Sequence, residues 1–180
     1  MSQAPSPSLS RTPEGTRTLM GPDRLAAYLN DHLAGSIAAR ELAERRRKEP
    51  LDDDVAKFLD RFISEIEEDR YALRRAMETA GVDPQKWKEL AAVGASWLDR
   101  LRPRISPSSP QLVRDIELLV MGVRGKLLLW NALAKLSDPP LSPSELGELM
   151  QRAERQLDQL ERLHGRAVDL ELTPAIARDS

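Results

Sequence analysis

Few residues in this 180-residue chain have side chains that could bind a metal ion or move a proton. The chain has two histidines, His32 and His164, and no cysteine. Glu161 precedes His164 at the Glu-x-x-His spacing, which on a helix places both side chains on one face. Glu41 and Glu117 could supply further carboxylates from other helices. One candidate site is therefore a carboxylate-rich metal centre formed by Glu41, Glu117, Glu161 and His164.

A second group of polar residues interrupts stripes that are otherwise apolar. When each predicted helix is written as a heptad-like seam, His32, Asp69 and Lys126 take inward positions on three different helices. A lone buried charge is costly, whereas a carboxylate between an ammonium and an imidazole forms a paired set. We expect a buried polar cluster in which Asp69 approaches Lys126 and His32 closely enough for direct or water-bridged contact. The alternative is that these side chains extend along the surface into solvent.

Composition excludes several classes of function. Lys and Arg total 27 and Asp and Glu 29, so the net charge of -2 gives no reason to expect binding to nucleic acid. Without cysteine the chain has no disulfide, thiolate metal site or cysteine nucleophile, as is typical of cytoplasmic proteins. No apolar run is long enough for a membrane span. We expect a cytoplasmic protein that binds neither nucleic acid nor membrane.

The pattern of residue types along the chain predicts three parts. Residues 1–21 are rich in Ser, Pro and Thr and predict a disordered tail. Residues 22–170 contain long segments with helical periodicity and predict one four-helix bundle. Residues 171–180 are expected to form a flexible C-terminus.

Four long segments within 22–170 have apolar residues at helical spacing, and strand signals are nearly absent. They cover about 22–48, 52–81, 110–133 and 142–169. The first ends in a basic run, 45–48, that we expect to be a solvated helix end, and Ser142 opens the last with a capping-box sequence. Helices of similar length favour an all-α bundle.

The connections between these helices predict how they run. Short links join the first helix to the second and the third to the fourth, which requires two antiparallel hairpins. The longer link from the second helix to the third contains a predicted short helix, 84–101, and can run back along the bundle. The second and third helices should then be parallel. In that arrangement His32, Asp69 and Lys126 lie at one height.

The segments YLNDHLAGS (28–36), EIEEDR (65–70) and GVRGKLLLW (122–130) resemble the ferritin-like superfamily, in particular small bacterial members without a complete di-iron motif. The resemblance covers 22–170 and implies a ferritin-like four-helix bundle with a long crossover. Functional members place a Glu on each of two helices and a Glu-x-x-His on each of the other two. Here only Glu161 and His164 match that motif, and the EIEE run of the second helix has no histidine.

Helical phase also argues against a di-iron site. Ile116 and Leu160 take the inward positions, which leaves the neighbouring Glu117 and Glu161 off the seam. We therefore expect no metal or other cofactor, and a lysine ammonium where the resemblance would place metal cations. The predicted function is a non-catalytic structural or interaction protein that binds a protein partner or forms a homodimer. The alternative is a divergent di-iron carboxylate oxidoreductase or iron-binding protein using Glu41, Glu117, Glu161 and His164.

Overall fold

The computed structural model describes residues 21–49, 52–82 and 110–173, and these residues form four helices without any strand. The helices are α1 (Gly21–Arg47), α2 (Asp53–Thr79), α4 (Gln111–Ala134) and α5 (Pro143–Glu171). This confirms the all-α fold class, with helix ends close to those expected from the sequence. The predicted helix 84–101 lies outside the described residues, as do 1–20 of the predicted tail and 174–180.

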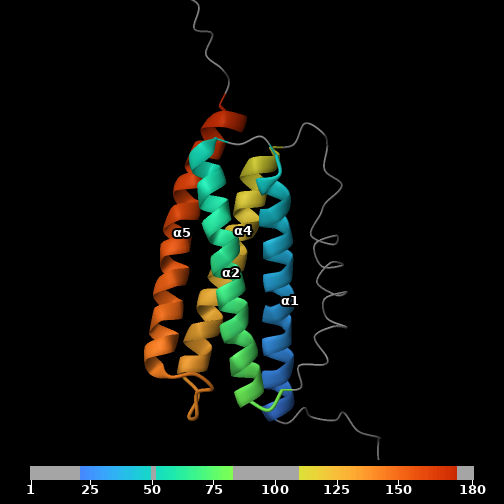
Figure 1. Ribbon diagram of the computed structural model, residues 1–180, viewed down its shortest axis with the longest axis vertical. Coiled ribbons are helices and arrows are strands. Elements are labelled where there is room, and N and C mark those ends of the chain that lie inside the picture. Colours follow the sequence, from blue (N-terminus) through green and yellow to red (C-terminus); the bar gives the residue numbers. More distant parts are fainter. Residues whose placement is uncertain (1–20, 50–51, 83–109, 174–180) are drawn as a thin grey trace, which may run out of the picture.

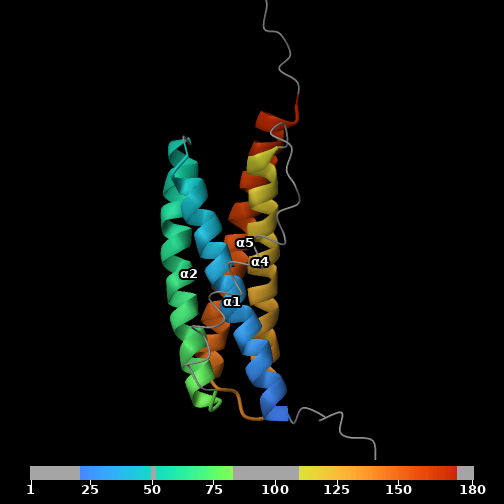
Figure 2. The ribbon, with the colours of Figure 1, turned by 90° about the vertical axis from the view of Figure 1, so that its right-hand side faces the viewer.

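The helices pack side by side in a bundle (Figure 1). α1 and α5 run upward in this view, whereas α2 and α4 run downward, so α2 and α4 are parallel as the long connection predicts. α1 packs against α2 and α4, and α5 packs against α4 and α2. Figure 2 shows the α1–α2 pair and the α4–α5 pair diverging toward the upper end. From these directions, each helix is antiparallel to the helices that it packs against.

Local capping explains where two of the helices begin. The Asp52 side chain accepts a hydrogen bond from the Asp54 backbone N–H at 2.8 Å, which satisfies a free donor at the start of α2. Ser142 does the same for α5 by accepting from the Glu145 N–H at 3.3 Å. The Glu145 carboxylate instead accepts a hydrogen bond from Arg75 of α2. The capping box predicted at Ser142 is thus half formed, and its second member joins α5 to α2.

The start of α4 is capped by a residue from the far end of the chain. Pro110 has no side-chain hydrogen bond to offer. The Glu171 carboxylate accepts from the backbone N–H groups of Leu112 and Val113 at 3.0 and 3.1 Å. An anion at this position also interacts favourably with the helix dipole. α5 accordingly extends through Glu171, one residue into the segment that the sequence predicted to be a flexible C-terminus.

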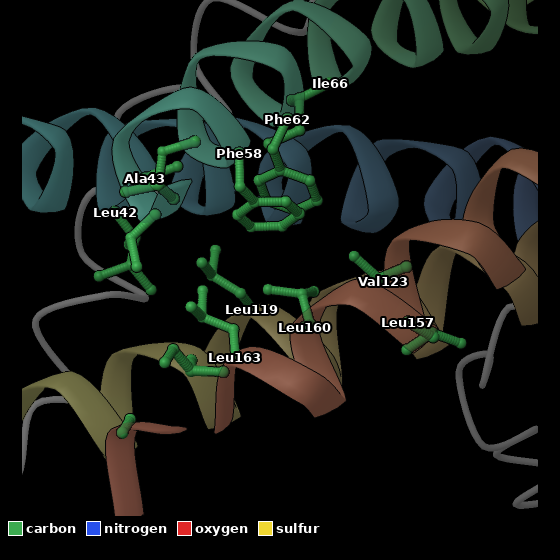
Figure 3. Close-up of a cluster of buried hydrophobic side chains, with 14 of the residues drawn as sticks. Leu42, Ala43, Phe58, Phe62, Ile66, Leu119, Val123, Leu157, Leu160 and Leu163 are labelled. Carbon is green, nitrogen blue, oxygen red and sulfur yellow. The ribbon is translucent and has the colours of Figure 1, made fainter. Parts of the chain in front are cut away.

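The core consists of two apolar clusters, one toward each end of the bundle. In the cluster at the upper end, Phe58 and Phe62 stack with ring centroids 5.4 Å apart. Figure 3 shows both rings projecting from α2 toward Leu119 of α4 and Leu160 of α5. The lower cluster surrounds Trp130. The two clusters fix the faces that the helices turn inward.

Candidate functional site

A buried ion pair lies between the two apolar clusters. Asp69 of α2 and Lys126 of α4 are in direct contact through a carboxylate oxygen and the ammonium nitrogen. Asp69 is 4% exposed, and the Lys126 side chain is 15% exposed. The structure therefore places these two sequence-predicted residues together in the interior, where the seam pattern put them.

Gln156 of α5 extends this contact. Its side-chain oxygen accepts a hydrogen bond from the Lys126 ammonium at 2.5 Å, and its amide nitrogen donates to a Glu65 carboxylate oxygen at 2.6 Å. Gln156 is itself buried. It interrupts the apolar stripe of α5 just as Asp69 interrupts that of α2. Alternating steps of three and four along α5 place Gln156 at an inward position between Ala153 and Leu160, and this spacing is the sequence signal that marks it.

Arg152 closes the network on the other side of Asp69. Its guanidinium donates to the second Asp69 oxygen at 2.9 Å and pairs with Glu68 at the same distance. Arg152 carries no such sequence signal, because it lies off the apolar stripe of α5. We call Glu65, Glu68, Asp69, Lys126, Arg152 and Gln156 the core network. It joins three helices at one level of the bundle.

Burial sets the electrostatics of this network. Loss of hydration disfavours the charged form of Lys126 and lowers its pKa from the usual value of 10.5, although the adjacent Asp69 opposes that change. Two hydrogen-bond acceptors at the ammonium offset much of the cost of removing it from water. The network is thus a satisfied set of charges that holds the helices in register.

His32 of α1 lines a cavity that Asp69 and Lys126 also line, but it is not part of the hydrogen-bonded core network. Its ring packs edge-on against Tyr28 with centroids 4.6 Å apart, and it approaches Gly125 of α4. Among the described residues its ring forms no hydrogen bond with Asp69 or Lys126. Burial lowers the pKa of His32 below 6.5, with Asp31 acting in the opposite direction. Direct contact in the predicted cluster is therefore limited to Asp69 and Lys126, because Lys126 extends toward α2 and α5.

A cavity of about 610 Å³ lies between α1, α2 and α4. His32, Asp69 and Lys126 all line it, so the three residues border the same space even though only Asp69 and Lys126 touch. Its other lining residues are mostly apolar and include Phe62 and Trp130. A cavity of this size with a few polar groups is typical of small-molecule sites.

The alternative metal residues are mostly separate from this interior. Glu41, Glu117 and Glu161 are exposed, and His164 is paired with Glu117 across α4 and α5 at 3.2 Å. The inward neighbours Ile116 and Leu160 are buried, as the phase argument predicted. No group of three or more His, Asp or Glu side chains suited to holding a metal occurs within the described ranges. The pair Glu117–His164 is the part of that set that the structure brings together.

Scans against protein-family models and searches of curated proteins and of solved structures find no match to the chain. Within 21–49, 52–82 and 110–173, no helix has the length and apolar character needed to cross a bilayer.

Proposed function

We propose that this protein is a non-catalytic ferritin-like bundle that acts as a structural or interaction protein in the cytoplasm, with the core network in place of a metal site. The observation that carries the proposal is the position of the Lys126 ammonium. It lies against Asp69 and Gln156 in the interior, where it and the Arg152 guanidinium neutralise a carboxylate that would otherwise attract a metal cation. Because side-chain cations balance the charge of the buried carboxylate, the bundle needs no metal ion to do so.

The surface of α4 supports the interaction role. Met121 and Leu128 are exposed, and their seven-residue separation puts them on one side of the helix. Exposed apolar side chains in a row mark contact surfaces more often than isolated ones do. A protein partner or a second copy of the chain would cover them. Neither nucleic acid nor membrane is part of the proposal.

The alternative is a divergent di-iron oxidoreductase or iron-binding protein. It would use Glu41, Glu117, Glu161 and His164, of which Glu117 and His164 are in contact. Purification without chelators followed by elemental analysis separates the two functions. We expect no stoichiometric iron, manganese or zinc. One or two transition metals per chain, lost when Glu161 and His164 are replaced, would establish the alternative.

A gain of metal binding provides a sharper test of the role of Lys126. Lys126→Ala removes the ammonium that contacts Asp69 and Gln156, while Arg152 still pairs with the second Asp69 oxygen. The first Asp69 oxygen and the Gln156 oxygen then lack their cation, so Mn²⁺ should raise the thermal midpoint of this variant but not that of the wild type. Lys57→Ala, at an exposed position of α2, serves as the matched control and should not respond. An equal response of all three proteins would show that Lys126 does not take the place of a cation.

Self-association is tested by analytical ultracentrifugation of the full chain. If a second copy covers α4, the wild type dimerises with increasing concentration, and Met121→Glu with Leu128→Glu makes it monomeric. A wild type that remains monomeric at all concentrations would assign the surface to a different partner protein or to none.

A further inference from the structure

A groove of about 320 Å³ lies between α2 and α5 near the upper end of the bundle. Figure 2 shows α2 and α5 lying farther apart at this end than at the lower end. The floor of the groove is apolar, since Phe58 and Leu163 are each 7% exposed and belong to the upper core cluster (Figure 3). We call it the arginine groove, and its lining consists of Asp54, Phe58, Arg61, Gln159, Arg162, Leu163 and Arg166.

Helical spacing brings the charged side chains of the groove to one place. Asp54 and Arg61 are seven residues apart on α2, and Arg162 and Arg166 are four apart on α5, so each pair lies on one side of its helix. The two helices are antiparallel (Figure 1), and Arg166 lies 4.0 Å from Asp54. Arg61 is two turns below Asp54, so the arginines are distributed over about 10 Å along the groove.

The charge of the arginine groove is unbalanced. Three arginines line it, against one aspartate. Among the residues that the structure describes, Arg61 and Arg162 form neither a hydrogen bond nor an ion pair. Arg166 has two long ion pairs, 3.7 Å to Asp52 and 4.0 Å to Asp54. An excess of one charge beside an apolar, low-dielectric wall concentrates the electric field and attracts ions of the opposite sign.

The guanidinium groups identify the class of anion. A planar guanidinium donates two parallel hydrogen bonds to the oxygens of a phosphate or a carboxylate. Three guanidinium groups and the Gln159 amide provide more donors than the two oxygens of one carboxylate can satisfy. Linked phosphate groups present several acceptor oxygens and negative charge along the length over which the arginines are distributed. A compound of this kind therefore matches both the number and the spacing of the donors.

We propose that the arginine groove binds a soluble small molecule that carries two or more linked phosphate groups, and that Arg61, Arg162 and Arg166 donate hydrogen bonds to its phosphate oxygens. The site goes beyond the proposed function, since it lies on α2 and α5 whereas the proposed contact surface lies on α4. It is also separate from the core network, none of whose residues line the groove.

The first experiment is a calorimetric titration of the full chain with inorganic tripolyphosphate at constant ionic strength. We expect saturable binding of one tripolyphosphate per chain. Arg61→Gln combined with Arg162→Gln should weaken binding at least about tenfold, because two charged donors are lost. Arg24→Gln combined with Arg124→Gln is the matched control. It removes the same charge at exposed positions outside the groove and should bind like the wild type.

The second experiment separates a soluble phosphate compound from a lipid headgroup. Sedimentation of the full chain with vesicles of phosphatidylcholine and phosphatidic acid measures binding to a phosphate-bearing surface. We expect the protein to remain in the supernatant, because the arginines border a groove between two helices. Sedimentation that is lost in the double variant of Arg61 and Arg162 would assign the groove to a lipid headgroup and overturn the proposal.

Four results of the titration would also overturn the proposal. These are no saturable binding to the wild type, an unchanged affinity in the double variant of Arg61 and Arg162, an equal loss in the control variant, and tighter binding of citrate than of tripolyphosphate. The last result would assign the groove to carboxylates. Circular dichroism checks that each variant remains helical. If the double variant does not fold, Arg61→Gln and Arg162→Gln are titrated singly, and unchanged affinity in both contradicts the proposal.

Discussion

Two regions of the bundle use the same kinds of ion pair in different surroundings. At mid-height the core network pairs Asp69 with Lys126 and Arg152 in the interior. At the upper end, where α1 finishes, Arg46 pairs with Asp115 at 2.6 Å and Arg47 pairs with Asp60 at 2.7 Å. The distances at that end are nearly equal. The Arg46 side chain is 9% exposed, however, whereas that of Arg47 is 42% exposed.

The comparison shows that distance alone does not rank these pairs. A charge held away from water loses its hydration permanently, so removal of its partner leaves an uncompensated cost. A charge at the surface recovers hydration when its partner is removed. The free-energy cost of removing a charge's partner should therefore decrease from the core network to Arg46 and then to Arg47. The basic run at the end of α1, expected to be solvated throughout, contains one member that is buried.

The largest expected effect is at the core network. Asp69→Ala should lower the free energy of unfolding by about 3 to 5 kcal/mol, since it leaves the Lys126 ammonium buried without its carboxylate. Asp69→Leu combined with Lys126→Met should recover much of that loss, because no charge is then left unpaired. Urea denaturation of the three proteins measures both effects. If Asp69→Ala hardly changes the free energy of unfolding, the core network does not depend on its partners more than Arg46 does.

The next effect separates the two neighbouring arginines. Arg46→Met keeps the apolar stem and removes the guanidinium that bonds to Asp115 of α4, so we expect a loss of about 1.5 to 3 kcal/mol in unfolding free energy. Arg47→Met is the matched control, and its unfolding midpoint should be unchanged within error. If both variants lose the same unfolding free energy, burial does not determine how much each ion pair contributes.

A smaller effect is expected at the start of α4. Glu171→Ala removes the acceptor for the Leu112 and Val113 N–H groups and should cost about 1 kcal/mol of unfolding free energy. Glu161→Ala changes another exposed glutamate of α5 and should cost little. Hydrogen exchange of the Leu112 and Val113 amides provides a local measurement. Unaltered exchange in Glu171→Ala would mean that the carboxylate does not cap α4 in solution.

The smallest effect concerns His32. Because burial lowers its pKa in the folded protein, the unfolded chain binds a proton more readily as the pH falls below about 6.5. Stability from this residue is thus present above pH 6.5 and is lost as the pH falls through the folded pKa. The free energy of unfolding should therefore fall less between pH 7 and pH 5 for His32→Leu than for the wild type. An NMR titration placing the His32 pKa at or above 6.5 would contradict this.

Much of the fold could be predicted because each helix carries its own signals. Apolar residues at helical spacing, Asp52 and Ser142 at helix starts, and Gly81 at the end of α2 are all local in sequence. Gly81 has φ of +69°, a conformation that glycine adopts readily and that ends a helix. The contact between Asp69 and Lys126 was also predictable, since connection lengths and helical rise give the relative heights of the residues. His32 lines the same cavity as Asp69 and Lys126 without a direct hydrogen bond to either among the described residues, because a seam gives the inward direction of a side chain but not the neighbour it meets.

The sequence by itself determined the helices, their approximate ends, the parallel direction of α2 and α4, and the inward phase of Ile116 and Leu160, because periodicity and chain length are local properties. Only the tertiary structure decided which polar groups are satisfied by distant partners. Gln156 accepts a hydrogen bond from Lys126, Glu171 caps α4, and Arg46 donates to Asp115, each across a large separation in sequence. These pairings depend on side-chain reach and helix tilt. They arise when whole helices pack against one another, so no local pattern of residues specifies them.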